Sequence, residues 1–109
     1  MIISFTSSKL NKLCSSERLM VKELGPNCAK ILKQRLLELE ASPNMRMIPP
    51  YARSHPLLGN RKGLYALDLE HPKRLVYKPD FEESGITESN ELDISQITAI
   101  VILEITDYH

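Results

Sequence analysis

Three side chains that can move protons stand consecutively at the end of the sequence. Asp107, Tyr108 and His109 follow the run 97–106, which reads ITAIVILEIT and whose many β-branched residues favour a buried strand. A regular strand places Asp107 and His109 on one face and Tyr108 on the other, although a bulge could bring all three together. In a cleft, such groups could orient a nucleophile, remove its proton and protonate a leaving group near neutral pH. The alternative is a solvated polar tail.

The charges of the chain are segregated, although the formal net charge is zero. The stretch 80–96 carries six acids and no Lys or Arg, so the remainder has 14 bases against eight acids. The basic residues are densest between positions 46 and 78: Arg46, Arg53, Arg61, Lys62, Lys73, Arg74 and Lys78. This distribution is expected of a surface that meets polyphosphate, and the alternative is an ordinary solvated face.

The first forty residues predict one strand and two helices. Residues 1–6 form a short strand, and Ser7 or Ser8 is then the N-cap of a helix that runs to about Leu24. Gly25 ends this helix, and Pro26 begins a second one that runs to about residue 40. Helices joined so tightly should pack as a hairpin.

The rest of the chain predicts strands. Four prolines between positions 43 and 56 exclude regular structure over a long and potentially functional loop. Residues 63–69 and 74–78 predict an antiparallel hairpin with 70–73 as its turn, and the acidic stretch predicts a surface loop. With the closing strand, this order predicts an α+β fold in which helices cover one face of an antiparallel sheet, built as one domain over residues 1–109.

Two cysteines bear on the compartment. Cys14 and Cys28 are too few to staple a secreted scaffold and lack metal-site spacing, so we expect reduced thiols, with a disulfide between them as the alternative. The start of the sequence has no signal-peptide pattern, and no apolar run approaches the roughly 20 residues that span a bilayer. We therefore expect a cytoplasmic protein without a membrane partner.

Three motifs together resemble one protein family. They are HPLLGNRKGLYALDL from residue 55, HPKRLVYKP from residue 71, and the closing TDYH. In this order, after two helices, they resemble the HigB-like branch of the RelE/ParE toxins, the killer proteins of plasmid-maintenance toxin–antitoxin modules. That family has a His-Pro-Leu-Lys-Gly-Asp-Arg loop, a strand bearing an Arg and a closing strand that ends in Asp-Tyr-His. Each motif alone arises easily by chance.

The resemblance implies a fold and a function. The fold is a pair of N-terminal helices packed on a twisted antiparallel sheet of about four strands. The function is ribosome-dependent cleavage of mRNA through attack of a ribose 2′-hydroxyl on the adjacent phosphate, with neither metal nor other cofactor. The implied partners are the ribosome, mRNA and a cognate antitoxin, often a HigA-like helix-turn-helix protein. Operator DNA would be contacted only by the antitoxin. Alternatives are a non-enzymatic toxin of this fold and an inactive relative that acts only by protein binding.

The resemblance also assigns residues. The catalytic positions are His55, Arg74, Asp107, Tyr108 and His109. His55 and His109 are the proton-transfer pair, and which of them is the base is left open because it depends on the substrate pose. Asp107 would orient a histidine, Tyr108 would stack on a base or bind a phosphate oxygen, and Arg74 would hold the scissile phosphate. The supporting RNA contacts are Arg53, Arg61, Lys62, Lys73 and Lys78.

The sequence departs from the family at two loop positions. Leu58 stands where the family usually has Lys, which removes a cation, and Asn60 stands where it often has Asp. The acidic stretch 80–96 would repel RNA if it lay beside the site and would do little from the far side. His71 is expected to be a turn residue, and no pair of ligands has recognisable metal spacing, so no metal site is expected.

Overall fold

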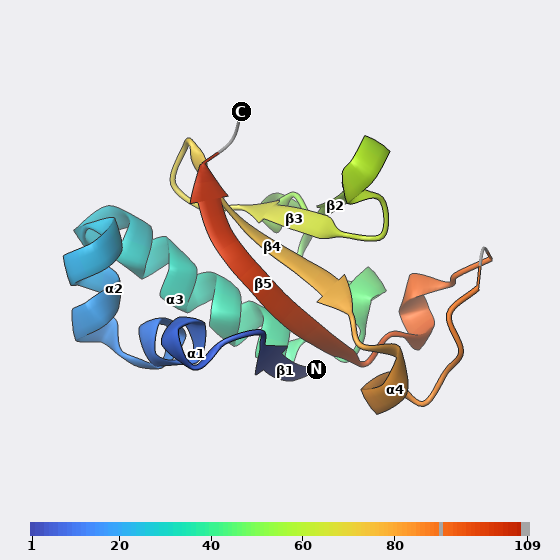
Figure 1. The fold of residues 1–109 in the computed structure, drawn as a ribbon. Helices are drawn as coiled ribbons and strands as arrows, with labels where there is room; N and C mark the ends of the chain where they lie inside the picture. Colours follow the sequence, from blue (N-terminus) through green and yellow to red (C-terminus); the bar gives the residue numbers. More distant parts are fainter. Residues whose placement is uncertain (90, 108–109) are drawn as a thin grey trace.

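The computed structural model describes residues 1–89 and 91–107 (Figure 1). In it, a five-stranded sheet has helices packed on one face. The strands are β1 (Ile2–Phe5), β2 (His55–Pro56), β3 (Tyr65–Asp68), β4 (Lys73–Pro79) and β5 (Ala99–Asp107). The helices are α1 (Ser8–Ser15), α2 (Glu17–Leu24), α3 (Pro26–Ala41) and α4 (Phe81–Ser84). Single 3₁₀ turns span Met45–Met47, Pro50–Ala52, Gly59–Arg61 and Ile94–Gln96.

The N-terminal region has three helices where two were predicted. Ser7 caps α1 as expected, because its side chain accepts a hydrogen bond from the Leu10 N–H. The predicted helix to Leu24 is then interrupted at Ser16, whose hydroxyl accepts a bond from the Leu19 N–H and so caps α2. This local bond competes with continuation of the helix. Gly25, with φ of 83°, separates α2 from α3 as the sequence indicated.

The predicted α+β class is confirmed, but the sheet is mixed and has five strands where an antiparallel sheet of about four strands was predicted. Its order is β1-β5-β4-β3-β2, in which the pairs β2–β3, β3–β4 and β4–β5 are antiparallel and the pair β1–β5 is parallel. The parallel pairing is possible because α1, α2, α3 and the long loop separate β1 from the other strands. The fifth strand, β2, is the two-residue segment His55–Pro56 within that loop.

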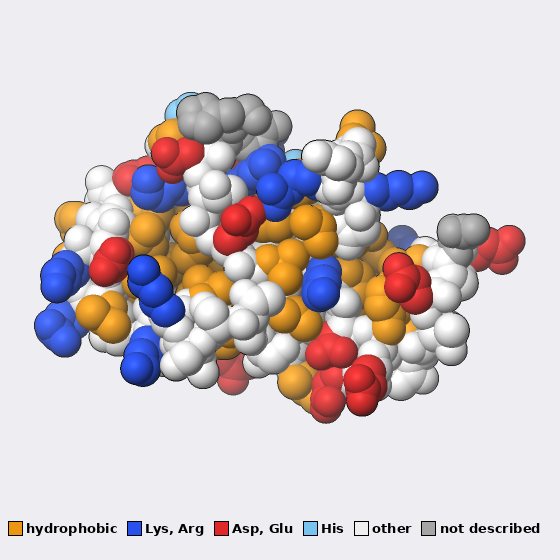
Figure 2. Space-filling view, in the orientation of Figure 1, with side chains coloured by type: hydrophobic (Ala, Val, Ile, Leu, Met, Phe, Trp, Pro, Cys, Tyr) orange, Lys and Arg blue, Asp and Glu red, His pale blue; other side chains and the backbone are white. Residues whose placement is uncertain are grey.

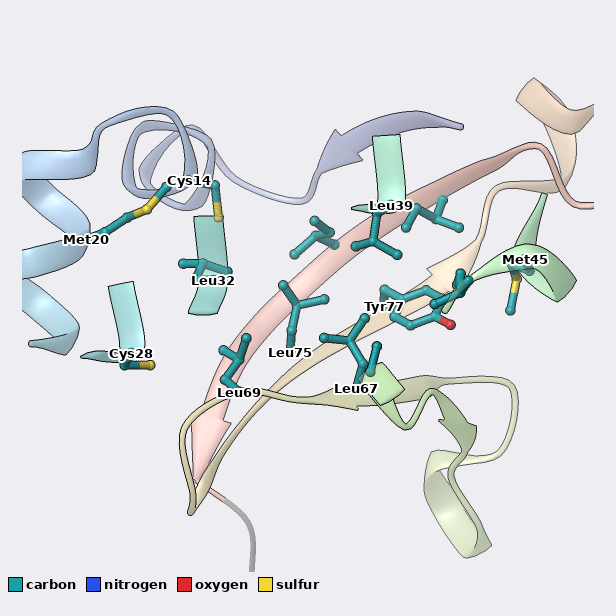
Figure 3. Close-up of a cluster of buried hydrophobic side chains, with 14 of the residues drawn as sticks. Cys14, Met20, Cys28, Leu32, Leu39, Met45, Leu67, Leu69, Leu75 and Tyr77 are labelled. Carbon is teal, nitrogen blue, oxygen red and sulfur yellow. The ribbon is translucent and has the colours of Figure 1, made fainter. Parts of the chain in front are cut away.

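The main core lies between the helices and one face of the sheet (Figure 3). Leu75 and Tyr77 of β4 and Ile100 and Ile102 of β5 are fully buried against α3 residues such as Leu32. We call the opposite side of the sheet the outer face. A smaller cluster covers its middle, where Leu57 and Leu64 pack on side chains of the central strands: Ala66, Val76 and Leu103.

One irregularity in the strand pairing determines which side chains of β5 face the core and which lie on the outer face. Tyr77 pairs with Ile102 and Val76 pairs with Glu104, so Leu103 is an extra residue opposite β4. Because of this bulge, Leu103 and Glu104 both lie on the outer face, and Ile105 returns to the core face. The predicted buried strand is confirmed in its first half and is only half-buried beyond residue 102.

The acidic stretch is a surface segment, as predicted, although it also contains α4. Asp80 caps this helix, whose first turn carries Glu82 and Glu83. Figure 2 shows acidic side chains gathered over α4, next to the start of β5 and remote from the end of that strand. Within the described part of the chain, no helix is both long and apolar enough to cross a membrane.

Candidate active site

Arg74 stands in the middle of the sheet on the outer face. It lies on the central strand β4, and its two cross-strand partners are Asp68 of β3 and Thr106 of β5. Leu75, the next residue, is buried in the main core, so alternation directs Arg74 away from the helices. A half-buried guanidinium in this position has β strands on both sides that hold it in place.

His55 is held on the same face by β2. It pairs in register with Ala66, two residues along β3 from Asp68. Its Nδ1 lies 2.8 Å from the backbone oxygen of Arg53. A carbonyl oxygen only accepts hydrogen bonds, so Nδ1 carries the proton and donates it. In the neutral ring, Nε2 therefore keeps its lone pair and is the nitrogen that can act as a base.

The segment before His55 is anchored to the core. The hydroxyl of Ser54 shares a short hydrogen bond with the phenol oxygen of Tyr77. Tyr77 is fully buried and stacks on Tyr65, with ring centroids 5.7 Å apart. Burial raises the pKa of Tyr77 to about 12, although the bond from Ser54 acts in the opposite direction. Tyr77 thus stays a neutral phenol and positions the segment instead of exchanging protons.

Three of the predicted RNA contacts are ion-paired with carboxylates of the sheet. Arg53 Nε lies 3.3 Å from Asp68, Arg61 lies 2.6 Å from Glu104, and Lys73 Nζ lies 3.2 Å from Asp107. Each acid lies on a strand and each base on a loop or at a strand end. The cations and carboxylates therefore alternate across the outer face and the end of the sheet.

Asp107 is placed at the end of β5 beside β4. It is the cross-strand partner of Lys73 and also accepts its hydrogen bond. Asp107 is one residue beyond Thr106, the partner of Arg74, so alternation directs its side chain to the opposite face from Arg74 at the end of the sheet. The other two predicted catalytic residues of this strand end, Tyr108 and His109, lie outside the described residues.

Two further predicted RNA contacts lie elsewhere. Lys62 is exposed and lines a different cleft, together with Leu58 and residues of the acidic stretch. Lys78 is exposed on β4 beside Val101, four residues along the strand from Arg74. Leu58, which the sequence motifs align with a Lys of the HigB-like toxins, has 85% of its surface exposed.

A cleft of about 290 Å³ lies along the edge of β3 on the side of β2. This edge is open beyond Ala66, because β2 pairs with β3 only at Tyr65 and Ala66. Its lining is mostly polar: Arg53, His55, Asp68, Leu69, His71, Pro72 and Lys73. Sequence reasoning set His71 aside as a turn residue, yet the β3–β4 turn brings it into the cleft that holds His55. The motif HPKR, next to a predicted strand, was the one signal that could have pointed to His71. The spacing of these residues in the sequence could not show that the turn lies near β2.

The arrangement can serve acid–base chemistry on a bound anion. His55 and Arg74 are separated by two strand spacings and two residues along the strands, which is about 12 Å between Cα atoms. Two long side chains can converge on one phosphate across that distance. Among the described residues, no group of three or more His, Cys, Asp or Glu side chains is placed to hold a metal ion.

Solved structures share this fold. A YoeB/ParE toxin from Agrobacterium tumefaciens aligns over 100% of both chains with a TM-score of 0.59 and 11% sequence identity. A chain of the YoeB-YefM complex from Staphylococcus aureus aligns over 100% of this chain and 97% of its own, with a TM-score of 0.57 and 17% identity. No family model matches the sequence, and no curated protein matches it. At these identities the likeness establishes the α+β fold of the YoeB/ParE toxins.

Proposed function

We propose that this chain is the toxin of a type II toxin–antitoxin module, a ribosome-dependent endoribonuclease that a cognate antitoxin neutralises. The observation that carries the proposal is the pair formed by Arg74 and His55 on the outer face, with Nε2 of His55 available as a base. The likeness to YoeB/ParE toxins over the whole chain supports it. The assignment to the HigB-like branch rests on the sequence motifs alone, because the structures with this fold carry the names YoeB and ParE.

The proposed reaction is cleavage by the ribose 2′-hydroxyl. His55 Nε2 accepts the proton of that hydroxyl, whose oxygen attacks the adjacent phosphorus, and Arg74 neutralises the charge on the phosphate oxygens. The bond to the 5′-oxygen of the next nucleotide then breaks, and that oxygen takes up a proton. His109 is the proposed donor, with Asp107 orienting it and Tyr108 contacting the substrate, so that no metal or cofactor takes part. The requirement for a 2′-hydroxyl makes RNA the substrate.

The acidic stretch lies far from the Asp107 end of the site, although its Glu88 lines one cleft with Pro56, the residue after His55. It meets β5 at Ala99, where the Asp80 N–H donates to the Ala99 oxygen. The nine residues of β5 separate that point from Asp107 by roughly 27 Å. This distance is about three times the Debye length of about 8 Å at physiological ionic strength, so repulsion at the Asp107 end of the site is largely screened.

The partners follow from the proposed role. We propose mRNA in the ribosome as substrate and a HigA-like helix-turn-helix antitoxin as inhibitor, with operator DNA bound only through that antitoxin, all in the cytoplasm. Of the predicted RNA contacts, Arg53, Arg61 and Lys73 lie around His55, Glu104 and Asp107 and are the ones we propose to meet the scissile region. Lys62 and Lys78 would contact RNA farther from the cut.

Expression without antitoxin tests the proposal. The wild-type chain should arrest growth and produce new mRNA 5′ ends at codon-linked positions in translating extracts. Replacing His55, Arg74 or His109 by Ala should relieve the arrest and remove these ends, whereas Lys30→Ala on the exposed side of α3 should change neither. Undiminished toxicity in all three site variants would contradict the site.

A non-enzymatic toxin of this fold is the second candidate. Two observations favour it: Leu58 is exposed at the family's usual Lys position, and the cations Arg53, Arg61 and Lys73 already hold carboxylates. Growth arrest without new RNA ends would support a toxin that acts through protein binding. Harmless expression would support an inactive relative.

A further inference from the structure

The cleft at the outer edge of β3 has donors that the proposed reaction does not use. It is bounded by the segment before β2 on one side and by the β3–β4 turn on the other, and His71 and Pro72 of that turn are exposed. The turn is held from both ends, since the Leu69 N–H donates to the Lys73 oxygen and the Lys73 N–H donates to the Glu70 oxygen. His71 is thus presented on a fixed turn.

Three side chains that donate hydrogen bonds to anions line the cleft together with His55: Arg53, His71 and Lys73. Arg53 binds Asp68 through Nε, and Lys73 gives one contact to Asp107. Arginine has five N–H donors and lysine has three, so each keeps donors for a second anion. The side chain of Arg53 is 77% exposed, which leaves its guanidinium accessible.

The cleft lies between the two halves of the proposed site. His55, the proposed base, is part of its wall, and Lys73 reaches from the same wall to Asp107 at the end of β5. A scissile phosphate within reach of His55 therefore lies beside the cleft, and one of its two neighbouring phosphates along the RNA chain can enter it. The described lining has no Phe, Tyr or Trp on which a base could stack, which favours the phosphate over the base as its occupant.

We propose that this cleft binds the RNA phosphate next to the scissile one, with His71, Lys73 and Arg53 as its donors. His71 is thereby a substrate-binding residue contributed by the β3–β4 turn. This inference rests on the proposed function, because it places the phosphate relative to the cut.

The test combines one variant with single neutral linkages in the substrate. Synthetic mRNAs carry one methylphosphonate at each position within three nucleotides of the cut, and cleavage on reconstituted translating ribosomes is followed for the wild type, His71→Ala and the control Lys30→Ala. On unmodified mRNA, His71→Ala should raise KM about tenfold with little change in kcat, as expected for losing one hydrogen bond to a charged group. Lys30→Ala should match the wild type.

The decisive readout is additivity. At one flanking linkage, the methylphosphonate should impair the wild type and Lys30→Ala but add little to the defect of His71→Ala, because the contact is already lost. If the two defects multiply at every linkage, or if His71→Ala is unimpaired, the subsite is wrong while cleavage by the wild type still upholds the proposed function. If abasic nucleotides, and not neutral linkages, abolish the difference, the cleft binds a base and the inference fails. Absence of cleavage by the wild type overturns the proposed function and this inference with it.

Discussion

His55 Nδ1 donates a hydrogen bond to the backbone oxygen of Arg53 over 2.8 Å, and this contact decides which ring nitrogen is free. A side chain amide at position 55 can copy either nitrogen but cannot act as a base. The contact therefore separates the structural role of the ring from its chemical role.

Replacing His55 by Asn should keep the structure and remove the chemistry. The Asn Nδ2 can donate to the Arg53 oxygen in place of Nδ1, so the melting temperature should stay close to that of the wild type. Cleavage of mRNA on ribosomes should fall by about 10²- to 10⁴-fold, the usual contribution of a general base. Cleavage within twofold of the wild type would exclude His55 as the base.

The bond between Ser54 and Tyr77 should link stability to catalysis. Tyr77→Phe and Ser54→Ala each remove it, and each should lower the free energy of unfolding by about 1 kcal/mol. Both should also lower kcat, because the segment that holds His55 loses its anchor. In the double variant the two effects should be strongly non-additive, and purely additive losses in denaturant titrations would show that the bond is not shared.

Removing the carboxylate that holds Arg61 should strengthen RNA binding. Glu104→Gln frees this guanidinium for a phosphate, so a short single-stranded RNA should bind more tightly. One additional phosphate contact should steepen the dependence of log K on log salt by about 0.7. Glu82→Gln on α4 removes the same charge far from the site and should leave that slope unchanged. An unchanged slope for Glu104→Gln would mean that Arg61 does not meet RNA.

The contact between α3 and the long loop should make stability depend on acid pH. Burial alone raises the pKa of Glu38, but hydrogen bonds from Tyr51, Gln34 and Arg35 outweigh it and hold the pKa below its usual value of 4.5. The stabilisation is therefore present above pH 4.5 and is lost as the pH falls through the lowered pKa.

Tyr51→Phe tests this relationship. The variant loses the hydrogen bond to Glu38 and should melt a few degrees below the wild type at neutral pH. The difference should shrink as the pH falls from 4.5 through the lowered pKa of Glu38, where the carboxylate becomes protonated. A difference that stays constant down to pH 3 would show that the bond does not depend on the carboxylate charge.

The sequence was sufficient for the order of most elements and not for how they pair. Runs of strand-forming residues between turn signals located β3 and β4, the density of β-branched residues located β5, and Ser7, Gly25 and Pro26 located helix boundaries. The break at Ser16 was missed because the apolar spacing continues through it, while a single side-chain hydrogen bond to Leu19 ends one helix and begins the next. The parallel pairing of β1 was missed because a short apolar run does not specify its neighbour.

The site was predictable only in part for the same reason. His55 and Arg74 lie on one face because β3 pairs with both of their strands and sets the register of each. His71 was missed because its place in the cleft depends on the two-residue strand β2, which is too short and too rich in proline to be predicted. The pairing of each cation with a carboxylate likewise depends on register, which spacing within one strand does not reveal.

The bulge at Leu103 determines which insertions and deletions β5 can tolerate. Because Tyr77 already pairs with Ile102 and Val76 with Glu104, deleting Leu103 would restore a regular ladder and keep Asp107 opposite Lys73. Deleting Ile105 or Thr106 would instead reverse the faces of the residues beyond it. The strand end can therefore keep its pairing when one residue is lost at position 103, but not when one is lost nearer the end. Related chains should accordingly vary in length at position 103 before they vary beyond it.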